Sequence, residues 1–329
     1  FPVIPNEDLK AEKSTSFEIG WNQIFNEYFG TDLHEDLRVK LGDDFRWFAP
    51  GVHATVYKHP TKRFLFDMDF DKVSHGQAGP FADCEDPNAV EDYEWPVVDH
   101  LDLGATIEGL QSFKDTYRAS GFWTAFYHHV MDFFGMENYL VKMYTHPEVV
   151  HAVTDRVCQF FYEANEFFFK EAGDYCEAFF FGNDFGTQRD LIMSPKLFDE
   201  FVMPWFKTFT DLGHRHGKQV ILHSCGSVYR VIPRLIDAGV DCLHPLQAQA
   251  ANLDAETLAR EFGNKITFLG GIDAQGILPH GTPQDVREEE FRVQKILGPH
   301  LIISPSHEAI LPDVPPENVA ALAEAAHQL

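Results

Sequence analysis

The chain has 329 residues, with 26 basic and 51 acidic side chains and a formal charge of −25. Hydrophobic residues make up 44% of it, which is enough to build a full core and excludes a disordered chain. The excess of acid argues against nucleic acid or an anionic membrane surface as a partner, because both would repel the protein.

The sequence carries no visible signal for export or membrane insertion. No apolar stretch approaches the roughly 18 residues that a membrane-spanning helix requires. The first ten residues, FPVIPNEDLK, contain neither the basic segment nor the apolar core of a signal peptide. Five cysteines, an odd number without a CxxC pair, suit a reducing compartment better than a disulfide framework. We therefore predict a cytoplasmic protein.

The N-terminal part of the chain is less regular than the rest. Residues 53–70 (HATVYKHPTKRFLFDMDF) predict an antiparallel hairpin, which we interpret as an insertion. No low-complexity linker or block of charge divides the sequence. We expect a single domain over residues 1–329, in which residues 1–120 are the divergent N-terminal part.

Strands are predicted from 121 onward by short apolar runs bounded by turn residues. GFWTAFYHH (121–129) predicts an early strand. The later runs are apolar on both faces, as strands of a parallel sheet covered on both sides should be. These later runs are CEAFFFG (176–182), KQVILHS (218–224), VDCLHPL (240–246), KITFLGG (265–271) and HLIISP (300–305).

Helix starts alternate with these strands. Capping residues or prolines at the first turn mark helices after Ser194, Asp254, Thr282 and Pro315. Pro204 should interrupt the first of these helices or divide it in two. Strand and helix alternating through five cycles predict an α/β fold with a parallel sheet. At this length a closed (β/α)8 barrel is the leading architecture, and an open doubly wound sheet is the second.

The strongest local motif is His223-Ser224-Cys225, at the end of a predicted strand. Residues two apart on a strand share a face, so His223 and Cys225 should point together into the carboxyl-terminal mouth of the barrel. Imidazole and thiolate are preferred ligands of zinc. The alternative is that both are buried packing residues, because free cysteine is among the most buried residue types.

A third ligand would favour the zinc site, and the last predicted strand offers one. His307 follows the run HLIISP and should lie at the same mouth. Two histidines and a cysteine with one open position make a catalytic zinc site.

Three more polar residues follow predicted strands. Asp184 could be a fourth ligand, a general base, or a turn residue beside Gly186. Gln247 and Asp273 each follow a strand and are candidate substrate contacts. The sequence contains no nucleophile elbow, phosphate-binding loop or dinucleotide fingerprint.

From about Gly121 onward the sequence resembles the uroporphyrinogen decarboxylase superfamily of (β/α)8 barrels. Four stretches carry the resemblance. They are GNDFGTQRDLIMSPKLFDEF (182–201), HSCGSVYRVIPRLIDAGVD (223–241), FLGGIDAQGILPHGTP (268–283) and SPSHEAILPDVPPENV (304–319).

The superfamily has two branches, and the chain resembles the corrinoid-dependent branch more. True decarboxylases carry an arginine-rich motif near their start that grips a tetrapyrrole, and nothing of that form occurs here. Corrinoid-dependent methyltransferases, such as methylcobalamin:coenzyme M methyltransferases, carry His-x-Cys as at His223 and Cys225. Their third zinc ligand is a cysteine in Ser-Pro-Gly-Cys, where this chain has Ser304-Pro305-Ser306-His307. Decarboxylases also have a histidine there, so His307 does not separate the branches.

The resemblance implies a zinc-dependent methyltransferase that moves a methyl group between a corrinoid (cobalamin) protein and a thiol, ether or other small substrate. His223, Cys225 and His307 would bind the metal, and a separate corrinoid protein would bring the cobalamin. Asp184 would handle a proton or complete the metal's coordination. The resemblance also suggests a homodimer.

Two other functions stay open at this stage. The first is a metal-free decarboxylase of a carboxylic acid, which would use His307 and Asp184. The second is a barrel without catalytic activity that senses or carries a corrinoid or tetrapyrrole.

Overall fold

The computed structural model describes residues 25–32, 34–50, 56–62, 65–68, 76–307 and 310–327. The chain divides into two compact units. We call Arg46–Cys242 the central unit, and Phe1–Phe45 together with Leu243–Leu329 the terminal unit. Each unit is described by itself.

The strands of the central unit follow the chain order in the sheet. They are β1 (Phe45–Trp47), β2 (Tyr117–Ser120), β3 (Ala178–Gly182) and β4 (Gln219–His223). β2 and β4 both pair with β3 in parallel, and Gly182 lies opposite His223 at the carboxyl ends. Every residue of β3 is buried, as expected for a parallel strand with both faces covered.

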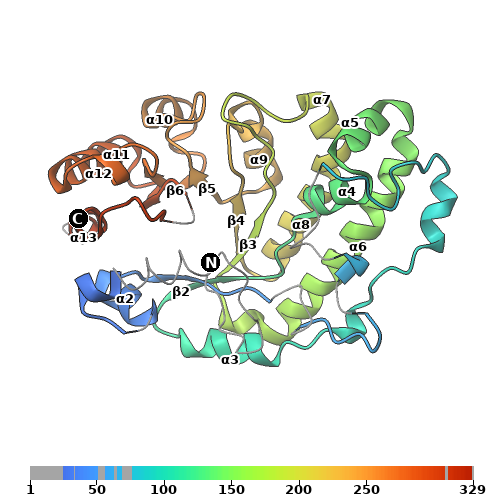
Figure 1. Ribbon diagram of the computed structural model, residues 1–329, viewed down its shortest axis with the longest axis horizontal. Helices are drawn as coiled ribbons and strands as arrows, with labels where there is room; N and C mark the ends of the chain where they lie inside the picture. The colour runs from blue at the N-terminus through green and yellow to red at the C-terminus, as the bar shows by residue number, and fades with distance from the viewer. Residues whose placement is uncertain are drawn as a thin grey trace. The chain divides into compact units, whose positions relative to one another are not determined.

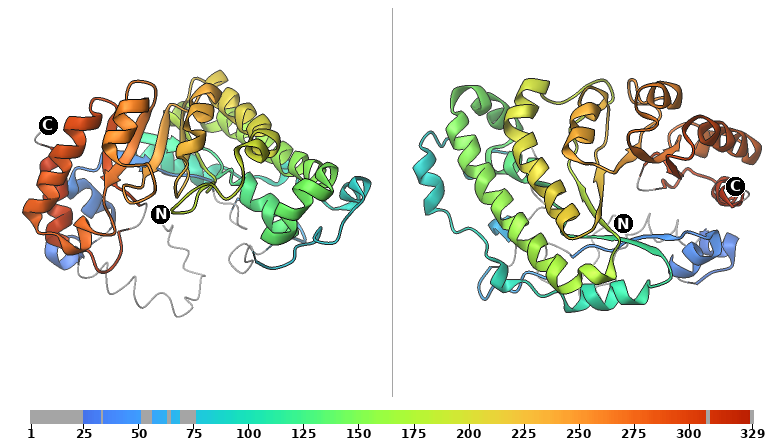
Figure 2. Two further views of the ribbon diagram at one scale, coloured as in Figure 1. Left: turned by 90° about the horizontal axis from the view of Figure 1, so that it is seen from above. Right: turned by 180° about the vertical axis from the view of Figure 1, so that it is seen from behind.

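Two long helices pack beside these strands. α6 (Pro147–Ala172) and α8 (Met203–Arg215) contact each other, and α8 also contacts β4 (Figure 1; Figure 2, right). Phe206 and Phe209 of α8 pack against Phe181 of β3. The other helices of the unit are α3 (Gly104–Ser112), α4 (Phe126–Phe134), α5 (Met136–Thr145), α7 (Pro195–Leu197) and α9 (Ile232–Ala238), with the 3-10 helices η1 (Leu65–Asp67), η2 (Pro87–Asp92), η3 (Val98–His100), η4 (Gly173–Tyr175) and η6 (Tyr229–Val231).

The stretch after Ser194 is interrupted before Pro204, as predicted. The Ser194 side chain accepts a hydrogen bond from the Leu197 N–H and caps α7. A π-helix, η5 (Phe198–Val202), then leads into α8, which has Pro204 in its first turn. Proline has no N–H to donate, so the regular helical hydrogen bonds cannot continue unbroken through this position.

The terminal unit contains the later strands and helices that the sequence predicts. β5 (Cys242–Leu246), β6 (Thr267–Ile272) and β7 (Leu301–Pro305) follow one another in the sheet, with β6 and β7 parallel. Asp254 caps α10, and Thr282 with Asp285 forms a capping box on α12. Helices of the unit include α2 (His34–Leu41), α10 (Ala255–Phe262), α11 (Ile277–His280), α12 (Pro283–Leu297) and α13 (Pro316–Ala326).

The predicted strand at 121–129 is wrong. β2 ends at Ser120, Gly121 turns the chain with a φ of 106°, and α4 begins at Phe126. Eight of the nine residues of α4 are buried. A helix that is covered on nearly all sides has no polar stripe, so its sequence looks like a buried strand.

The predicted hairpin at 53–70 is also not found in the part of it that the structure describes. Tyr57 forms an isolated antiparallel bridge with Leu101 instead, and Leu65–Asp67 is a 3-10 helix. The remaining residues of this segment, 53–55, 63–64 and 69–70, lie outside the described residues.

The predicted parallel α/β architecture is confirmed, but the described residues provide seven strands and not eight. No helix among them combines the length and the apolar character needed to cross a bilayer.

Candidate metal centre

The carboxyl ends of β3 and β4 bring together an acid, an imidazole and a thiol. Asp184 lies two residues beyond β3, His223 is the last residue of β4, and Cys225 lies two residues further. His223 Nε2 is 3.3 Å from Cys225 Sγ and 3.4 Å from Asp184 Oδ1. One donor atom from each side chain lies within 4.8 Å of the other two.

The donor types and their spacing fit a zinc ion. Nitrogen, sulfur and carboxylate oxygen are the three ligand atoms that zinc takes in proteins. With bonds of about 2.0–2.3 Å and tetrahedral angles, neighbouring donor atoms lie roughly 3.3–3.8 Å apart. Both distances from His223 Nε2 lie in that range. The imidazole is almost fully buried, whereas Asp184 and Cys225 are half-buried, so the cluster is open on one side.

Backbone hydrogen bonds between the two loops hold the cluster in place. The Cys225 N–H donates to Asp184 Oδ1 at 2.8 Å, which ties the acid to the loop that carries the thiol. The Phe185 N–H donates to the buried Ser224 Oγ at 3.1 Å. Further along, the Ser227 N–H donates to the Thr187 carbonyl at 2.7 Å.

Two glycines let these loops touch backbone to backbone. Gly226 has a φ of 79°, and a Cβ there would lie 2.4 Å from the carbonyl carbon and oxygen of Gly186. A Cβ on Gly186 would in turn lie 2.8 Å from the backbone of Ser227. Neither position has room for a side chain unless the loops separate. We call this Gly186–Gly226 contact the loop clasp.

We expect Gly226→Ala to lower the free energy of unfolding by more than Gly217→Ala. Both glycines have a left-handed backbone, which costs a residue with a Cβ about 1–2 kcal/mol. A Cβ on Gly217 would meet no atom within 4 Å, so substitution there measures that backbone cost alone. The difference between the two variants in urea denaturation gives the added cost of opening the loop clasp. Equal losses in the free energy of unfolding would show that the loops separate without cost.

Asn183 links the end of β3 by hydrogen bonds to the start of α4 and the residues just before it. Its N–H donates to the His223 carbonyl at 2.9 Å, and its side-chain Nδ2 donates to the Thr124 carbonyl at 2.9 Å. Its Oδ1 accepts from the Tyr127 N–H at 2.9 Å, and the residue is 1% exposed. The strand ends that carry the cluster are therefore fixed on both sides.

Asp184 is ionised at neutral pH. Burial by itself would raise the pKa of this carboxyl, but the hydrogen bond and charge of His223 and the Cys225 N–H outweigh burial and lower the pKa to about 2. His128 in α4 adds a smaller effect in the same direction. The Asp184 carboxylate is therefore negatively charged near pH 7 and is a poor proton donor there.

The third residue predicted to bind zinc lies in the terminal unit. His307 stands two residues beyond β7 and is half-buried. The group formed by Asp184, His223 and Cys225 is complete within the central unit. The ligand role of His307 stays a prediction.

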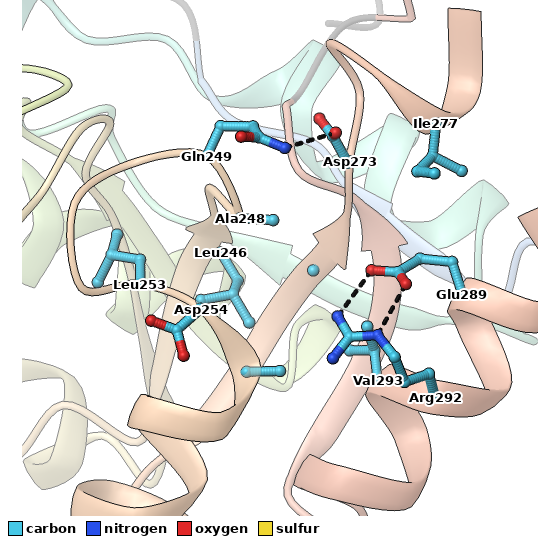
Figure 3. A pocket seen from close by; sticks show the side chains of 12 residues that line it. Leu246, Ala248, Gln249, Leu253, Asp254, Asp273, Ile277, Glu289, Arg292 and Val293 are labelled. Atoms are coloured by element: carbon cyan, nitrogen blue, oxygen red, sulfur yellow. Dashed lines mark hydrogen bonds and ion pairs between the residues drawn. The ribbon is translucent and has the colours of Figure 1, made fainter. Parts of the chain in front are cut away.

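The two predicted substrate contacts also lie in the terminal unit, in different surroundings. Asp273 is 5% exposed and lines a cavity of about 280 Å³ (Figure 3). Its Oδ2 accepts from Gln249 Nε2 at 2.8 Å, and Arg292 with Glu289 forms another wall of the cavity. Gln247 directly follows β5 but does not line this cavity.

A comparison with known families settles where the chain belongs. The family described as uroporphyrinogen decarboxylase (URO-D) matches residues 85–329, well over half of the chain and parts of both units. The chain belongs to the uroporphyrinogen decarboxylase family. The match covers Asp184, His223 and Cys225 as well as His307.

Two proteins similar to this chain are methyltransferases from Methanosarcina mazei. A methylated-thiol–coenzyme M methyltransferase of Methanosarcina mazei is 27% identical over 157 residues, covering 46% of this chain and 38% of that protein. The match therefore spans well under half of the relative's length. A solved structure of a methyltransferase from Methanosarcina mazei has a TM-score of 0.65 at 16% identity, over 92% of this chain and 90% of that chain. At that identity the likeness shows a shared fold.

Two features of the site are not evident from the sequence. Trp123 stands edge-to-face against the His223 ring, with centroids 5.5 Å apart and planes at 62°. It falls in the segment wrongly predicted as a strand, which hides its place beside the cluster. The loop clasp is marked in the sequence by Gly186 and Gly226, but the sequence does not tell which backbones touch.

Proposed function

We propose that the protein is a zinc-dependent methyltransferase that moves a methyl group between a corrinoid (cobalamin) protein and a thiol, ether or other small substrate. The observation that carries this proposal is the cluster of Asp184, His223 and Cys225. The relative from Methanosarcina mazei supports it, because its name describes methyl transfer with a methylated thiol and coenzyme M. The resemblance of His-x-Cys to the corrinoid-dependent branch supports the corrinoid partner.

Each residue of the cluster has a part in this proposal. His223 and Cys225 would hold zinc through Nε2 and Sγ, and Asp184 would add a charged oxygen while keeping the Cys225 backbone in place. His307 is our candidate for a further ligand, and Gln247 and Asp273 for substrate contacts. When bound, zinc supplies Lewis-acid activation of a sulfur or oxygen atom of the substrate.

The charge state of Asp184 favours this function over a metal-free decarboxylase. That alternative needs Asp184 and His307 to handle the proton that replaces the carboxyl group. A carboxyl with a pKa of about 2 is almost entirely ionised near neutral pH and holds little proton to donate. The same ionised group is well suited to a cation.

We further propose that residues 1–329 form a single domain built as a closed (β/α)8 barrel, working in the cytoplasm as a homodimer. Support for one domain comes from the family match, which runs through both units from 85 to 329. The solved methyltransferase supports it too, since it matches 92% of the chain.

Zinc content tests the metal site directly. We expect the wild-type protein, purified without chelator, to hold about one zinc per chain, and Cys225→Ser to lose most of it. Cys84→Ser is the control, because the Cys84 thiol donates to the Asp86 carbonyl and is outside the cluster. Metal retained in Cys225→Ser would show that the ligand assignment is wrong, and a wild type without zinc would favour the decarboxylase.

Methyl transfer is then assayed with free methylcobalamin against a series of thiols, and with reduced cobalamin against methyl thioethers and methyl ethers. We expect turnover in one direction by wild type and Cys84→Ser, and a loss of at least about 100-fold in Cys225→Ser. Equal turnover by all three proteins would overturn the proposed role of the cluster.

A further inference from the structure

Trp123 packs against His223, a proposed zinc ligand, and against two further aromatic rings. Its indole meets the His223 imidazole edge-to-face at a centroid distance of 5.5 Å. Trp47 lies 5.0 Å away and Phe180 lies 6.0 Å away by the same measure. Edge-to-face and tilted contacts at these distances are favourable for aromatic rings. The indole is therefore held by side chains from β1, β3 and β4.

Gly182 provides the space in which the indole lies. Gly182 pairs with His223 across β3 and β4. A Cβ at Gly182 would lie 2.2 Å from both Cζ2 and Cη2 of Trp123 and 3.1 Å from Cβ of His223. The first distance is far below van der Waals contact, so the indole occupies the volume that any other side chain at position 182 would take.

We propose that Trp123 is a positioning residue for the proposed zinc site: its indole, seated over Gly182, fixes the imidazole of His223 so that Nε2 faces Cys225 Sγ and Asp184 Oδ1. The strand sets only the backbone of His223, and the ring is still able to turn about its two side-chain torsions. The indole edge removes that freedom before the metal arrives. This inference rests on the proposed function, and it concerns a residue that touches neither the ion nor the reacting atoms.

The size of the expected effect follows from other metal sites. Loss of a group that orients a metal-binding histidine costs about 10- to 100-fold in metal affinity. Trp123→Ala frees the ring, so we expect zinc binding to weaken by at least about tenfold. Trp123→Phe keeps an aromatic edge beside His223 and should recover most of that loss.

The first experiment measures zinc affinity by competition with a chromophoric chelator, together with the visible spectrum of the cobalt(II)-loaded protein, which reports coordination geometry. Trp205→Ala is the matched control, since Trp205 lies on α8 and donates to Asp155 away from the cluster. We expect weaker zinc binding and an altered cobalt spectrum in Trp123→Ala alone. A folded Trp123→Ala with wild-type zinc affinity would overturn the inference.

A double-mutant cycle with Gly182→Ala separates positioning from general damage. In the wild-type background Gly182→Ala must displace the indole, so it should weaken zinc binding about as much as Trp123→Ala. In the Trp123→Ala background the space is empty, so the added alanine should cost much less. Losses that simply add would contradict the mechanism. Thermal unfolding of all four proteins shows whether a variant that binds zinc weakly is also unfolded. If Trp123→Ala does not fold, Trp123→Phe replaces it in the cycle with Gly182→Ala.

The outcome distinguishes this inference from the function on which it rests. Zinc that is bound by wild type, lost in Cys225→Ser and unchanged in Trp123→Ala overturns the positioning role alone. A wild type without zinc overturns both.

Discussion

Replacing Asp184 with asparagine is expected to weaken zinc binding by more than about 100-fold and to reduce methyl transfer by at least the same factor. Asparagine keeps an oxygen that accepts the Cys225 N–H, so the loop has no reason to move. What disappears is the negative charge of the Asp184 carboxylate, whose pKa lies near 2. Loss of a residue that only orients a ligand lowers metal affinity by up to about 100-fold, and loss of a directly bound carboxylate should lower it further.

Asp190→Asn is the matched control for this substitution. Asp190 lies in the same loop after β3, is exposed, and pairs with Arg230. It should bind zinc as the wild type does. If Asp184→Asn also binds zinc normally, Asp184 acts only as the hydrogen-bond acceptor that holds Cys225, and the metal takes its ligands elsewhere. The chelator competition described for Trp123 measures both variants.

The strands of the second half could be predicted because each is a short apolar run with a clear end. β3 to β7 all fall within or overlap the predicted runs. β2 could not be found in the same way, since Tyr117 and Arg118 are polar and not fully buried, and Arg118 pairs with Glu177 at 2.7 Å. Because this ion pair makes the first half of the strand polar, no apolar run marks it. The neighbouring apolar run belongs to the buried helix α4 instead.

The site could be predicted in part from spacing along one strand. His223 and Cys225 are two residues apart, and the structure brings Nε2 and Sγ to 3.3 Å. Cys225 lies beyond the end of β4, however, and its place depends on the loop clasp and on the N–H bond to Asp184. Whether Asp184 is a metal ligand, a general base or a turn residue could not be decided from the sequence, because each role depends on distances between two loops.

Asp273 and Gln249 in the terminal unit show what a position after a strand end does not predict. Asp273 follows β6 as predicted, but its carboxylate is directed at Gln249 and a cavity between β5, β6 and the helices α10 and α12. Following a strand end fixes where the backbone lies, whereas the partner of the side chain is set by the next loop. Gln249, two residues after the predicted Gln247, carries no signal in the sequence that would have selected it.

Replacing Glu290 with methionine is expected to stabilise the protein at pH 8 by about 3 kcal/mol. Glu290 lies on the buried face of α12 with Val286, Val293 and Leu297, and it is 0% exposed. Neither carboxyl oxygen has a hydrogen-bond partner among the described residues. Burial therefore raises the pKa of Glu290 to about 7 from an ordinary value of 4.5. Methionine has a similar length and needs no partner, so it fits the same apolar surroundings.

The sign of the pH dependence follows from which state holds the proton more tightly. The folded protein keeps Glu290 protonated up to about pH 7, whereas the unfolded chain releases that proton near pH 4.5. The free energy of unfolding of the wild type therefore falls as the pH rises between these values, by about 3 kcal/mol in all, because one pKa unit corresponds to 1.36 kcal/mol. The contribution of protonated Glu290 to the free energy of unfolding is fully present below pH 4.5 and lost above pH 7.

Urea denaturation of wild type and Glu290→Met at pH 5 and pH 8 isolates this effect, since all other titrating groups are common to both proteins. The gain from methionine should be about 2–3 kcal/mol larger at pH 8 than at pH 5. Glu288→Met is the control, because Glu288 is exposed on the same helix and accepts a hydrogen bond from Gln284. A gain that is equal at the two pH values would mean that Glu290 finds a partner for its charge in solution, and the buried face of α12 would then have to open to water.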